Sequence, residues 1–268
     1  MYETTYHRAA SLSEAQSAMS QADDGKYLAG GQTLIATMKQ RLAAPSDVID
    51  ISRLAELQGI EAGADSLTIG AATTHAEVAG SSAVRGSIAA LAELAGHIGD
   101  PHVRYVGTLG GSVANNDPAA DYPAAVLGLD GTVHTDQRAI AAGDFFTGLF
   151  ETALADNEII TRISFTVPQS AAYEKFANPA SRYAMVGVLV AKMKDGSVRV
   201  AVTGAGDNGV FRSAALESAL AGSGSADAVD SVAVDAGGIL SDIHGSAAYR
   251  AHLVTVMAKR AAQRSGWS

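Results

Sequence analysis

Two glycine-rich loops are the segments whose residue types and spacing could best do chemistry. They are Ala29-Gly30-Gly31-Gln32-Thr33 and Thr108-Leu109-Gly110-Gly111-Ser112. Consecutive glycines at a strand-to-helix junction let the backbone approach a ligand closely, and free amides at the following helix start favour an anion such as pyrophosphate. Either loop alone is better explained as a turn followed by a helix cap. Together, the two loops could grip one diphosphate.

The polar residues that follow the second loop could extend such a site. Ala114-Asn115-Asn116-Asp117-Pro118 carries side chains able to bond a ribose or a phosphate. The alternative for Asn115, Asn116 and Asp117 is an Asx-turn and helix cap. For Asp121 the alternative is an acid in the first turn of a helix, facing the helix dipole. Spacing alone leaves both explanations open.

The first loop must be positioned by a small α/β layer. A short strand ending at Tyr27-Leu28 precedes it, and a helical pattern from Leu34 to Leu42 follows, with Leu34, Ile35, Met38 and Leu42 on one face. Val48, Ile49 and Ile51 then predict a second strand. Strand–helix–strand order normally gives a parallel pair of strands.

The second loop lies in a middle region. This region begins with a strand at 67–70, a capping box from Thr74 to Glu77, and a helix from Ile88 to Ile98. We expect a long loop from Gly99 to Asp117, then a helix with Asp117 as cap and Pro118 at its first position. Strands at 131–135 and 159–167 complete the region.

A change of pattern at Pro168-Gln169-Ser170 predicts a boundary. After it, strands 184–193 and 198–202 flank Asp195-Gly196, which is typical of a tight hairpin turn. Leu216 and Leu220 indicate one helix, and Tyr249, Leu253, Val256 and Met257 indicate another.

Composition excludes several classes of function. A net charge of −9 argues against a nucleic-acid partner, which requires clustered Lys and Arg. The longest apolar run, 184–193, is about half of the roughly 20 residues that a membrane helix needs. The absence of cysteine excludes a disulfide, a protein-ligated iron–sulfur cluster and a thiolate zinc site within the chain. The polar residues 1–8 favour the cytoplasm, with export in complex with a partner as the alternative.

Other possible motifs are weak. Residues 204–209 spell G-x-G-x-x-G, but the preceding strand belongs to a hairpin and Ser213 is the more natural cap of the next helix, so we interpret them as a turn. The seven histidines show no metal-ligand spacing, and no G-x-S-x-G serine motif is present. We predict no metal site and no catalytic residue of the chain's own.

Several segments resemble the FAD-binding medium subunit of molybdenum hydroxylases, the group that includes carbon monoxide, nicotine and xanthine dehydrogenases. The first segments are Tyr27-Leu28-Ala29-Gly30-Gly31-Gln32-Thr33-Leu34, Met38 to Leu42, Gly99-Asp100-Pro101-His102-Val103-Arg104, and Gly107 to Ser112 through Asp117-Pro118-Ala119-Ala120-Asp121. Tyr173-Glu174-Lys175, Ala180 to Ala184 and Gly245 to Arg250 extend the resemblance over essentially the whole chain. Gln32-Thr33 and Ser112 depart from the residues frequent in the family but keep hydrogen-bonding groups.

The resemblance implies an α+β fold. A two-subdomain FAD-binding domain of the vanillyl-alcohol-oxidase (PCMH) type would occupy residues 1–169, divided at about 55 and 56. Residues 170–268 would form a small α+β carboxyl-terminal domain, like that of carbon monoxide dehydrogenase flavoproteins, with an antiparallel sheet and helices.

The resemblance also implies site roles. Ala29 to Thr33 and Thr108 to Ser112 would hold the FAD pyrophosphate, and Asn115 and Asp121 would bond the ribityl or ribose region. Lys175 and Tyr183 would lie near the isoalloxazine. A solvated surface amine is the alternative for Lys175, and ordinary packing of an aromatic ring is the alternative for Tyr183.

Finally, the resemblance implies an electron relay. A large molybdopterin subunit would oxidise the substrate, a small subunit with [2Fe–2S] clusters would relay electrons, and FAD on this chain would pass them to NAD, a quinone or oxygen. The assembly would be a dimer of heterotrimers. The alternatives are a self-contained FAD-dependent oxidase or reductase with its own substrate site, and a partner-binding module that has lost FAD. Intact glycines in both loops argue against the last.

Overall fold

A parallel sheet at the amino end positions the first glycine loop. In the computed structural model, which describes residues 1–268, its strand order is β1-β3-β2, with β1 (Thr5–Arg8), β2 (Gly25–Leu28) and β3 (Asp47–Asp50). Helices α1 (Leu12–Gln21) and α2 (Leu34–Lys39) connect the strands. The predicted parallel pair β2–β3 is confirmed. The sequence pattern did not reveal β1, because this edge strand is mostly exposed and carries no alternation of apolar residues.

The predicted core face of α2 is wrong at Leu42. The helix ends at Lys39, three residues earlier than expected, and Arg41 adopts a left-handed conformation with φ of 60°. Leu42 is therefore turned outward and 80% exposed, whereas Met38 is buried. Helical periodicity cannot be extended past the residue where the backbone leaves the helix.

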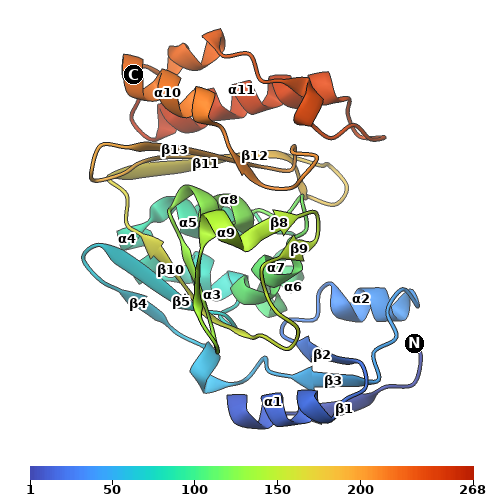
Figure 1. The fold of residues 1–268 in the computed structure, drawn as a ribbon. Helices are drawn as coiled ribbons and strands as arrows, with labels where there is room; N and C mark the ends of the chain where they lie inside the picture. The colour runs from blue at the N-terminus through green and yellow to red at the C-terminus, as the bar shows by residue number, and fades with distance from the viewer.

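The middle of the molecule is an antiparallel sheet wrapped by short helices (Figure 1). Its order is β4-β5-β10-β6-β7, with β4 (Ile60–Ala62), β5 (Ser66–Gly70), β6 (Thr132–Thr135), β7 (Ala139–Ala141) and β10 (Ile160–Thr166). Around it lie the 3-10 turn η1 (Ala55–Leu57), helices α3 (His75–Gly80), α4 (Ser82–Ser87), α5 (Ala89–Gly96), α8 (Tyr122–Gly128) and α9 (Ala142–Phe145), and the hairpin β8 (Phe146–Gly148) and β9 (Glu151–Thr152). The capping box predicted from Thr74 to Glu77 is present at the start of α3.

The expected long loop from Gly99 to Asp117 is wrong. Two short helices, α6 (Pro101–Val106) and α7 (Leu109–Asn115), occupy most of it. Asp100 and Thr108 cap them by accepting hydrogen bonds from the backbone N–H groups of Val103 and Gly111. These helices are too short to show a clear apolar stripe, so their caps were the only signal in the sequence.

The helix expected at Pro118 starts four residues later. Asp121 occupies the position before α8, and Pro123 lies in its first turn. Asp117 instead accepts a hydrogen bond from the Ala119 amide at 2.8 Å, which is an Asx-turn. Asp-Pro at 117–118 and Asp-Tyr-Pro at 121–123 offer similar start signals, and tertiary packing selected the second.

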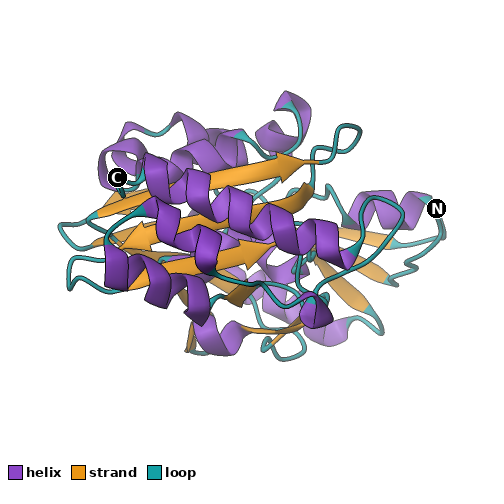
Figure 2. Cartoon of the chain, turned by 90° about the horizontal axis from the view of Figure 1, so that it is seen from above, coloured by secondary structure: helices purple, strands orange, loops and turns teal.

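The carboxyl-terminal part is the predicted antiparallel sheet with helices. The sheet order is β11-β12-β13-β14, with β11 (Ser170–Ala177), β12 (Ala184–Lys192), β13 (Val198–Thr203) and β14 (Phe211–Arg212). Gly196 has a φ of 86° in the β12–β13 turn, as expected for Asp-Gly. Helices α10 (Ala214–Ser223) and α11 (Ala247–Arg264), which with the 3-10 turns η2 (Ala226–Ser231) and η3 (Ala236–Gly238) follow the strands in the chain, cover the outer face (Figure 2).

The carboxyl-terminal sheet is buried on both faces, which joins it firmly to the middle region. Val186, Val188 and Val190 of β12 contribute to a core with α10 and α11, whereas Leu189 and Ala191 belong to the core beneath. A β-strand sends alternate side chains to opposite faces, so a strand buried on both faces is apolar throughout. This explains why residues 184–191 are apolar without interruption, up to the exposed Lys192 at the end of the strand. A smaller core lies against the parallel sheet, and Leu57, Ala72 and Ile159 of the middle region contribute to it.

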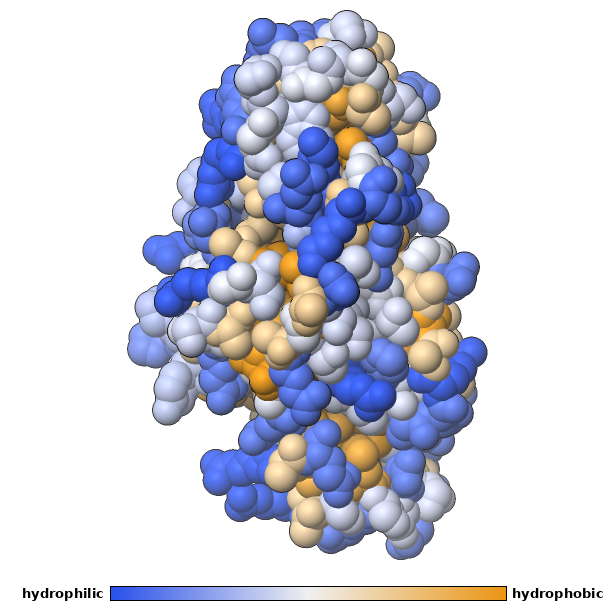
Figure 3. Space-filling model, turned by 90° about the vertical axis from the view of Figure 1, so that its left-hand side faces the viewer, coloured by the Kyte–Doolittle hydropathy of each residue, from blue (hydrophilic) through white to orange (hydrophobic).

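The outer surface is mixed in character. On the face shown in Figure 3, hydrophilic residues predominate and hydrophobic ones are scattered in small groups. No helix of the protein has both the length and the apolar character needed to cross a bilayer.

Candidate functional site

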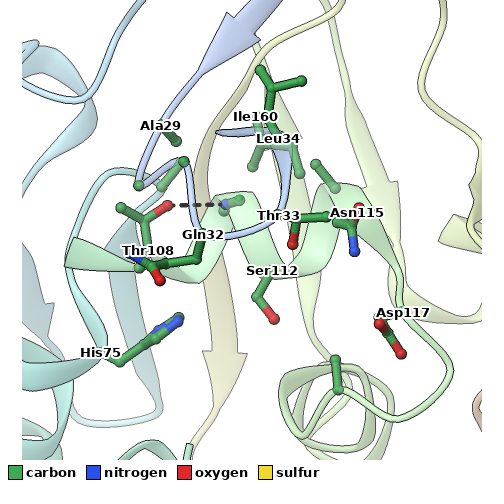
Figure 4. A pocket seen from close by; sticks show the side chains of 18 of the residues that line it. Ala29, Gln32, Thr33, Leu34, His75, Thr108, Ser112, Asn115, Asp117 and Ile160 are labelled. Atoms are coloured by element: carbon green, nitrogen blue, oxygen red, sulfur yellow. Dashed lines mark hydrogen bonds between the residues drawn. The ribbon is translucent and has the colours of Figure 1, made fainter. Parts of the chain in front are cut away.

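A cavity of about 510 Å³ lies where the three sheets meet. Binding pockets for cofactors and other small molecules usually fall between about 300 and 1,000 Å³. Both glycine loops border it, although their sequence positions are far apart (Figure 4). The carboxyl-terminal sheet contributes the connection between β11 and β12, including Arg182 and Tyr183.

The first loop presents a row of unused hydrogen-bond donors. The backbone N–H groups of residues 29–33 donate to no acceptor in the protein, because the β2–β3 ladder ends at Leu28 and helix α2 has not yet begun. Gly31, with a φ of 68°, turns the chain between these elements, and its carbonyl accepts a hydrogen bond from Ile35. Peptide N–H groups without partners are strong binding groups for an anion.

The second loop is built differently. Its amides from Leu109 to Ser112 are already satisfied: Leu109 donates to Thr73 O, Gly110 to Ala71 O, and Gly111 to the Thr108 hydroxyl. Ser112 donates to Thr108 O at 3.1 Å. The second loop therefore supplies a fixed wall and side chains, and does not form a second cradle of free amides.

Two glycines serve contacts within the protein. A Cβ on Gly30 would lie 2.3 Å from the carbonyl oxygen of Val106, and a Cβ on Gly110 would lie 2.5 Å from Cβ of Ala71. These glycines let the loops approach neighbouring segments, whereas the sequence-based interpretation assigned them to approach of a ligand. Gly30 directly joins the first loop to the residues that precede the second, so packing between chain segments holds the two loops together.

Four polar side chains on the cavity wall make no hydrogen bond within the protein. They are Gln32, Thr33, Ser112 and Asn115, which all line the cavity. Figure 4 shows them around one space, contributed by the two loops and by helix α7. A bound ligand would therefore find hydroxyl and amide groups that need not break existing bonds.

Asp121 lies at the buried end of the site. Its carboxylate accepts hydrogen bonds from the Tyr173 hydroxyl at 2.6 Å and from Nζ of Lys175 at 2.9 Å. Burial raises the pKa of Asp121, and the Lys175 ammonium and the Tyr173 hydroxyl oppose that shift. Asp121 lines the cavity, but much of its hydrogen-bonding capacity is already used.

The remaining predicted site residues fall into two groups. Tyr183 lines the cavity and is 47% exposed, and partial burial raises the pKa of its hydroxyl. Lys175 and Leu109 do not line it. Lys175 is not the solvated amine that was the alternative, since its side chain is 4% exposed and paired with Asp121. Leu109 is fully buried behind the second loop, where it contributes packing.

Sequence reasoning assigned no site role to several polar residues of the cavity wall, which are Lys26, His75, Glu158, Ser181 and Arg182. His75 was hidden inside the capping box of α3, and Glu158 stood at the edge of a predicted strand. The Glu158 side chain is fully buried, and hydrogen bonds from Arg138, the Ala155 amide and Thr135 lower its pKa to about 2. An acid immediately before a buried strand was the one available signal for Glu158.

The G-x-G-x-x-G run lies in turns outside the cavity wall. Gly204 and Gly209 have φ angles of 80° and 94°, and helix α10 begins later, capped by Ser213. Its interpretation as a turn is confirmed. The structure contains no group of three or more His, Asp or Glu side chains arranged to hold a metal ion.

Comparison with known proteins identifies the fold and the family. Residues 2–170 match the family described as the FAD binding domain in molybdopterin dehydrogenase. The chain belongs to this family. The FAD-binding assignment and the α+β fold class are therefore confirmed.

Full-length relatives agree with this assignment. The chain is 36% identical to the nicotine 6-hydroxylase medium subunit of Paenarthrobacter nicotinovorans, over 97% of this chain and 96% of that protein. It is 32% identical to the carbon monoxide dehydrogenase medium chain of Hydrogenophaga pseudoflava, over 96% and 94%. A crystal structure of Cu,Mo-carbon monoxide dehydrogenase superposes with a TM-score of 0.91 at 30% identity, covering 99% of this chain and 98% of that one.

The chain is thus an FAD-binding oxidoreductase subunit of the molybdenum hydroxylase family. These relatives are described as medium subunits or chains, and they match this chain over nearly their whole lengths. That agreement favours the subunit interpretation over a self-contained oxidase with its own substrate site.

Proposed function

We propose that the cavity between the glycine loops is the FAD site and that the free amides of Ala29 to Thr33 hold the pyrophosphate. The observation that carries this proposal is the row of N–H groups without acceptors beside the polar side chains of Gln32, Thr33 and Ser112. A pyrophosphate offers several charged acceptor oxygens, and hydrogen bonds to a charged acceptor are roughly twice as strong as neutral ones. The residues present therefore fit the cofactor.

The other predicted contacts follow from this placement. Asn115, with its side-chain amide unpaired, would bond the ribityl or ribose region. Tyr183 would lie against the isoalloxazine at the exposed side of the cavity. Lys175 would act through Asp121, because it is paired with that carboxylate and does not line the cavity. Leu109 would support the second loop from behind.

FAD, when bound, supplies the electron transfer that the chain's own side chains cannot perform, receiving electrons from iron–sulfur clusters and passing them to an external acceptor. The chain's residues bind the cofactor, orient it and shield it. None of them is required as a general acid or base.

We further propose that the chain works in a dimer of heterotrimers with a large molybdopterin subunit and a small [2Fe–2S] subunit, in the cytoplasm. The matched family and the medium-subunit relatives support this assembly. We also propose that the chain has two domains, residues 1–169 and 170–268, and that the first domain is divided into two subdomains near residue 55. The small core beside the parallel sheet supports that division, since six of its nine residues precede residue 55.

One experiment tests the cofactor site. The purified chain is saturated with FAD and passed through gel filtration, and a flavin absorbance that elutes with the protein is expected. Gly111→Val should weaken FAD binding, because the added side chain points from the second loop toward Ala29 of the first. Gly222→Val on α10, where a Cβ has no neighbour within 4 Å, is the matched control. Unchanged affinity of the Gly111 variant would remove the second loop from the site.

A second experiment tests the assembly. The tagged chain is recovered from its native host under mild conditions. Co-purification with a four-cysteine iron–sulfur protein and a large molybdopterin protein is expected. Recovery of a lone monomer that oxidises organic substrates by itself would instead favour the self-contained oxidase.

A further inference from the structure

His75 is a buried polar residue on the cavity wall with no assigned role. It is the first residue of α3 and is 4% exposed. Its backbone N–H donates to Gly107 O at 2.9 Å, and its ring packs against Tyr122 with ring centroids 5.3 Å apart. Both contacts fix the imidazole, which in Figure 4 extends from below Thr108 toward the space bordered by Gln32 and Ser112.

Gly107 makes room for this ring. A Cβ on Gly107 would lie 2.7 Å from Nε2 of His75, although the backbone there, with φ of −62°, would accept any residue. The glycine is therefore required by the imidazole and not by a turn. The ring occupies the gap between the residues preceding the second loop and the cavity.

Neither imidazole nitrogen has a partner in the protein. Nδ1 is buried without a hydrogen bond. Nε2 also makes no hydrogen bond, but it is not fully buried. It is therefore accessible from the cavity. Buried side-chain polar atoms nearly always have a partner, and an exception calls for an explanation such as a ligand.

The imidazole is neutral at physiological pH. Burial lowers the pKa of His75 to about 4, and the nearby Arg104 guanidinium adds to the shift. A neutral imidazole has one N–H donor and one acceptor. It therefore suits an uncharged oxygen better than a phosphate, which would favour the protonated ring.

The burial of Nδ1 indicates which nitrogen carries the proton. A buried N–H without an acceptor is rarer in proteins than a buried acceptor without a donor. Placing the proton on Nε2 leaves only an acceptor unpaired at Nδ1 and directs the donor at the cavity.

We propose that Nε2–H of His75 donates a hydrogen bond to an uncharged oxygen of bound FAD, a ring carbonyl or a ribityl hydroxyl. This inference rests on the proposed FAD site and adds a polar contact that lies outside both glycine loops. Because the ring is held by Gly107 and Tyr122, the donor is in place before the cofactor binds.

The direct test is nuclear magnetic resonance of the chain labelled with 15N-histidine. Comparison with His75→Gln assigns the His75 signals among the seven histidines. At neutral pH we expect a neutral ring protonated at Nε2, with the Nε2 resonance shifting on FAD saturation. His75 signals that do not change while FAD binds would overturn the proposal and leave the FAD site intact. Absence of FAD binding by the unaltered chain would overturn the proposed FAD site itself.

Variants give an independent test. His75→Phe keeps the ring but removes the donor, and should raise the dissociation constant of FAD roughly three- to tenfold, as expected for one hydrogen bond. His75→Gln restores an N–H near the Nε2 position and should recover most of that loss. His252→Phe on α11 is the matched control, since that histidine is exposed and does not line the cavity. Equal affinity of His75→Phe and the unaltered chain would refute the contact. If His75→Phe does not fold, the shift of the Nε2 resonance on FAD saturation and the FAD affinity of His75→Gln still test the contact.

Discussion

Asp121 and Lys175 form an ion pair of 2.9 Å, and each side chain is 4% exposed. Asp121 precedes α8 in the middle region, whereas Lys175 belongs to strand β11 of the carboxyl-terminal sheet. The pair therefore joins the middle region, at the cavity wall, to the carboxyl-terminal sheet. The Nζ atom of Lys175 also donates to His97 O, which follows α5.

Removing Lys175 should be strongly destabilising. Lys175→Met leaves the Asp121 carboxylate buried without its cation, which typically costs about 3–5 kcal/mol. Adding Asp121→Asn should recover part of that loss, because the unpaired charge is removed. Urea unfolding measures both. The control is Lys194→Met in the exposed pair with Asp65, where the loss should stay below about 1 kcal/mol. Similar losses for the buried and exposed lysines would contradict the prediction.

Stability should fall as the pH drops below about 6.5. The folded pKa of His75, about 4, lies below its ordinary value of 6.5, so the unfolded chain binds a proton more readily between these values. The corresponding destabilisation is on the order of 3 kcal/mol once the pH reaches 4. His75→Gln should flatten the dependence of the melting temperature on pH in this window. An unchanged profile would show that the imidazole is not buried as described.

A second loss of stability should follow at lower pH. The folded pKa of Glu158 is about 2, below its ordinary value of 4.5, so its contribution is present above 4.5 and disappears as the pH falls through 2. Glu158→Gln should weaken this second step while leaving the histidine step in place. Circular dichroism during acid titration separates the histidine step from the glutamate step. The same single step in His75→Gln and in Glu158→Gln would argue against assigning the two steps to these residues.

The two glycine loops should differ in hydrogen exchange. Amides 29–33 have no acceptor and should exchange rapidly in the chain without FAD, whereas amides 109–112 are bonded and should exchange slowly. FAD should slow exchange in the first loop. Protection of the second loop alone would reverse the roles that we assign to the loops.

Gly30→Ala should destabilise the fold. The new Cβ would lie 2.3 Å from Val106 O and 2.6 Å from Cα of Gly107, so backbone must move, at a cost of about 1–3 kcal/mol. Gly80→Ala is the matched control, since its Cβ would have no neighbour within 4 Å. Denaturant midpoints compare the two. An equally stable Gly30 variant would mean that the loops are not held together by this contact.

Tyr183→Ala should change the flavin signal more than the stability. The ring is 47% exposed, so its loss removes little buried area, but it lines the cavity where the isoalloxazine is proposed to lie. We expect brighter fluorescence of bound FAD, because a stacked aromatic ring quenches it. Tyr105→Ala, at a ring 78% exposed and outside the cavity wall, should leave the emission unchanged. Equal emission from both variants would place Tyr183 away from the ring.

The sequence by itself determined the local features. The apolar run 184–193, the Asp195-Gly196 turn and the Thr74 capping box each depend on neighbours within a few residues, and each appears as predicted. The two loops and their resemblance to a known family predicted FAD binding, because the family's motif is itself a local pattern. The polar edge strand β1 and the short helices α6 and α7 carried too few apolar residues to be recognised.

Only the tertiary structure decided which glycine loop has free backbone amides. Whether an amide in a glycine loop is free depends on acceptors from other segments, and Thr73 and Ala71 supply them to the second loop alone. Distant residues also decide the environment of two side chains. Lys175 is buried by contact with Asp121, and the His75 ring reaches the cavity because Gly107 has no side chain to block it. The burial and the hydrogen-bond partners of a polar group depend on residues that are distant in the sequence. One stretch of sequence therefore cannot predict them.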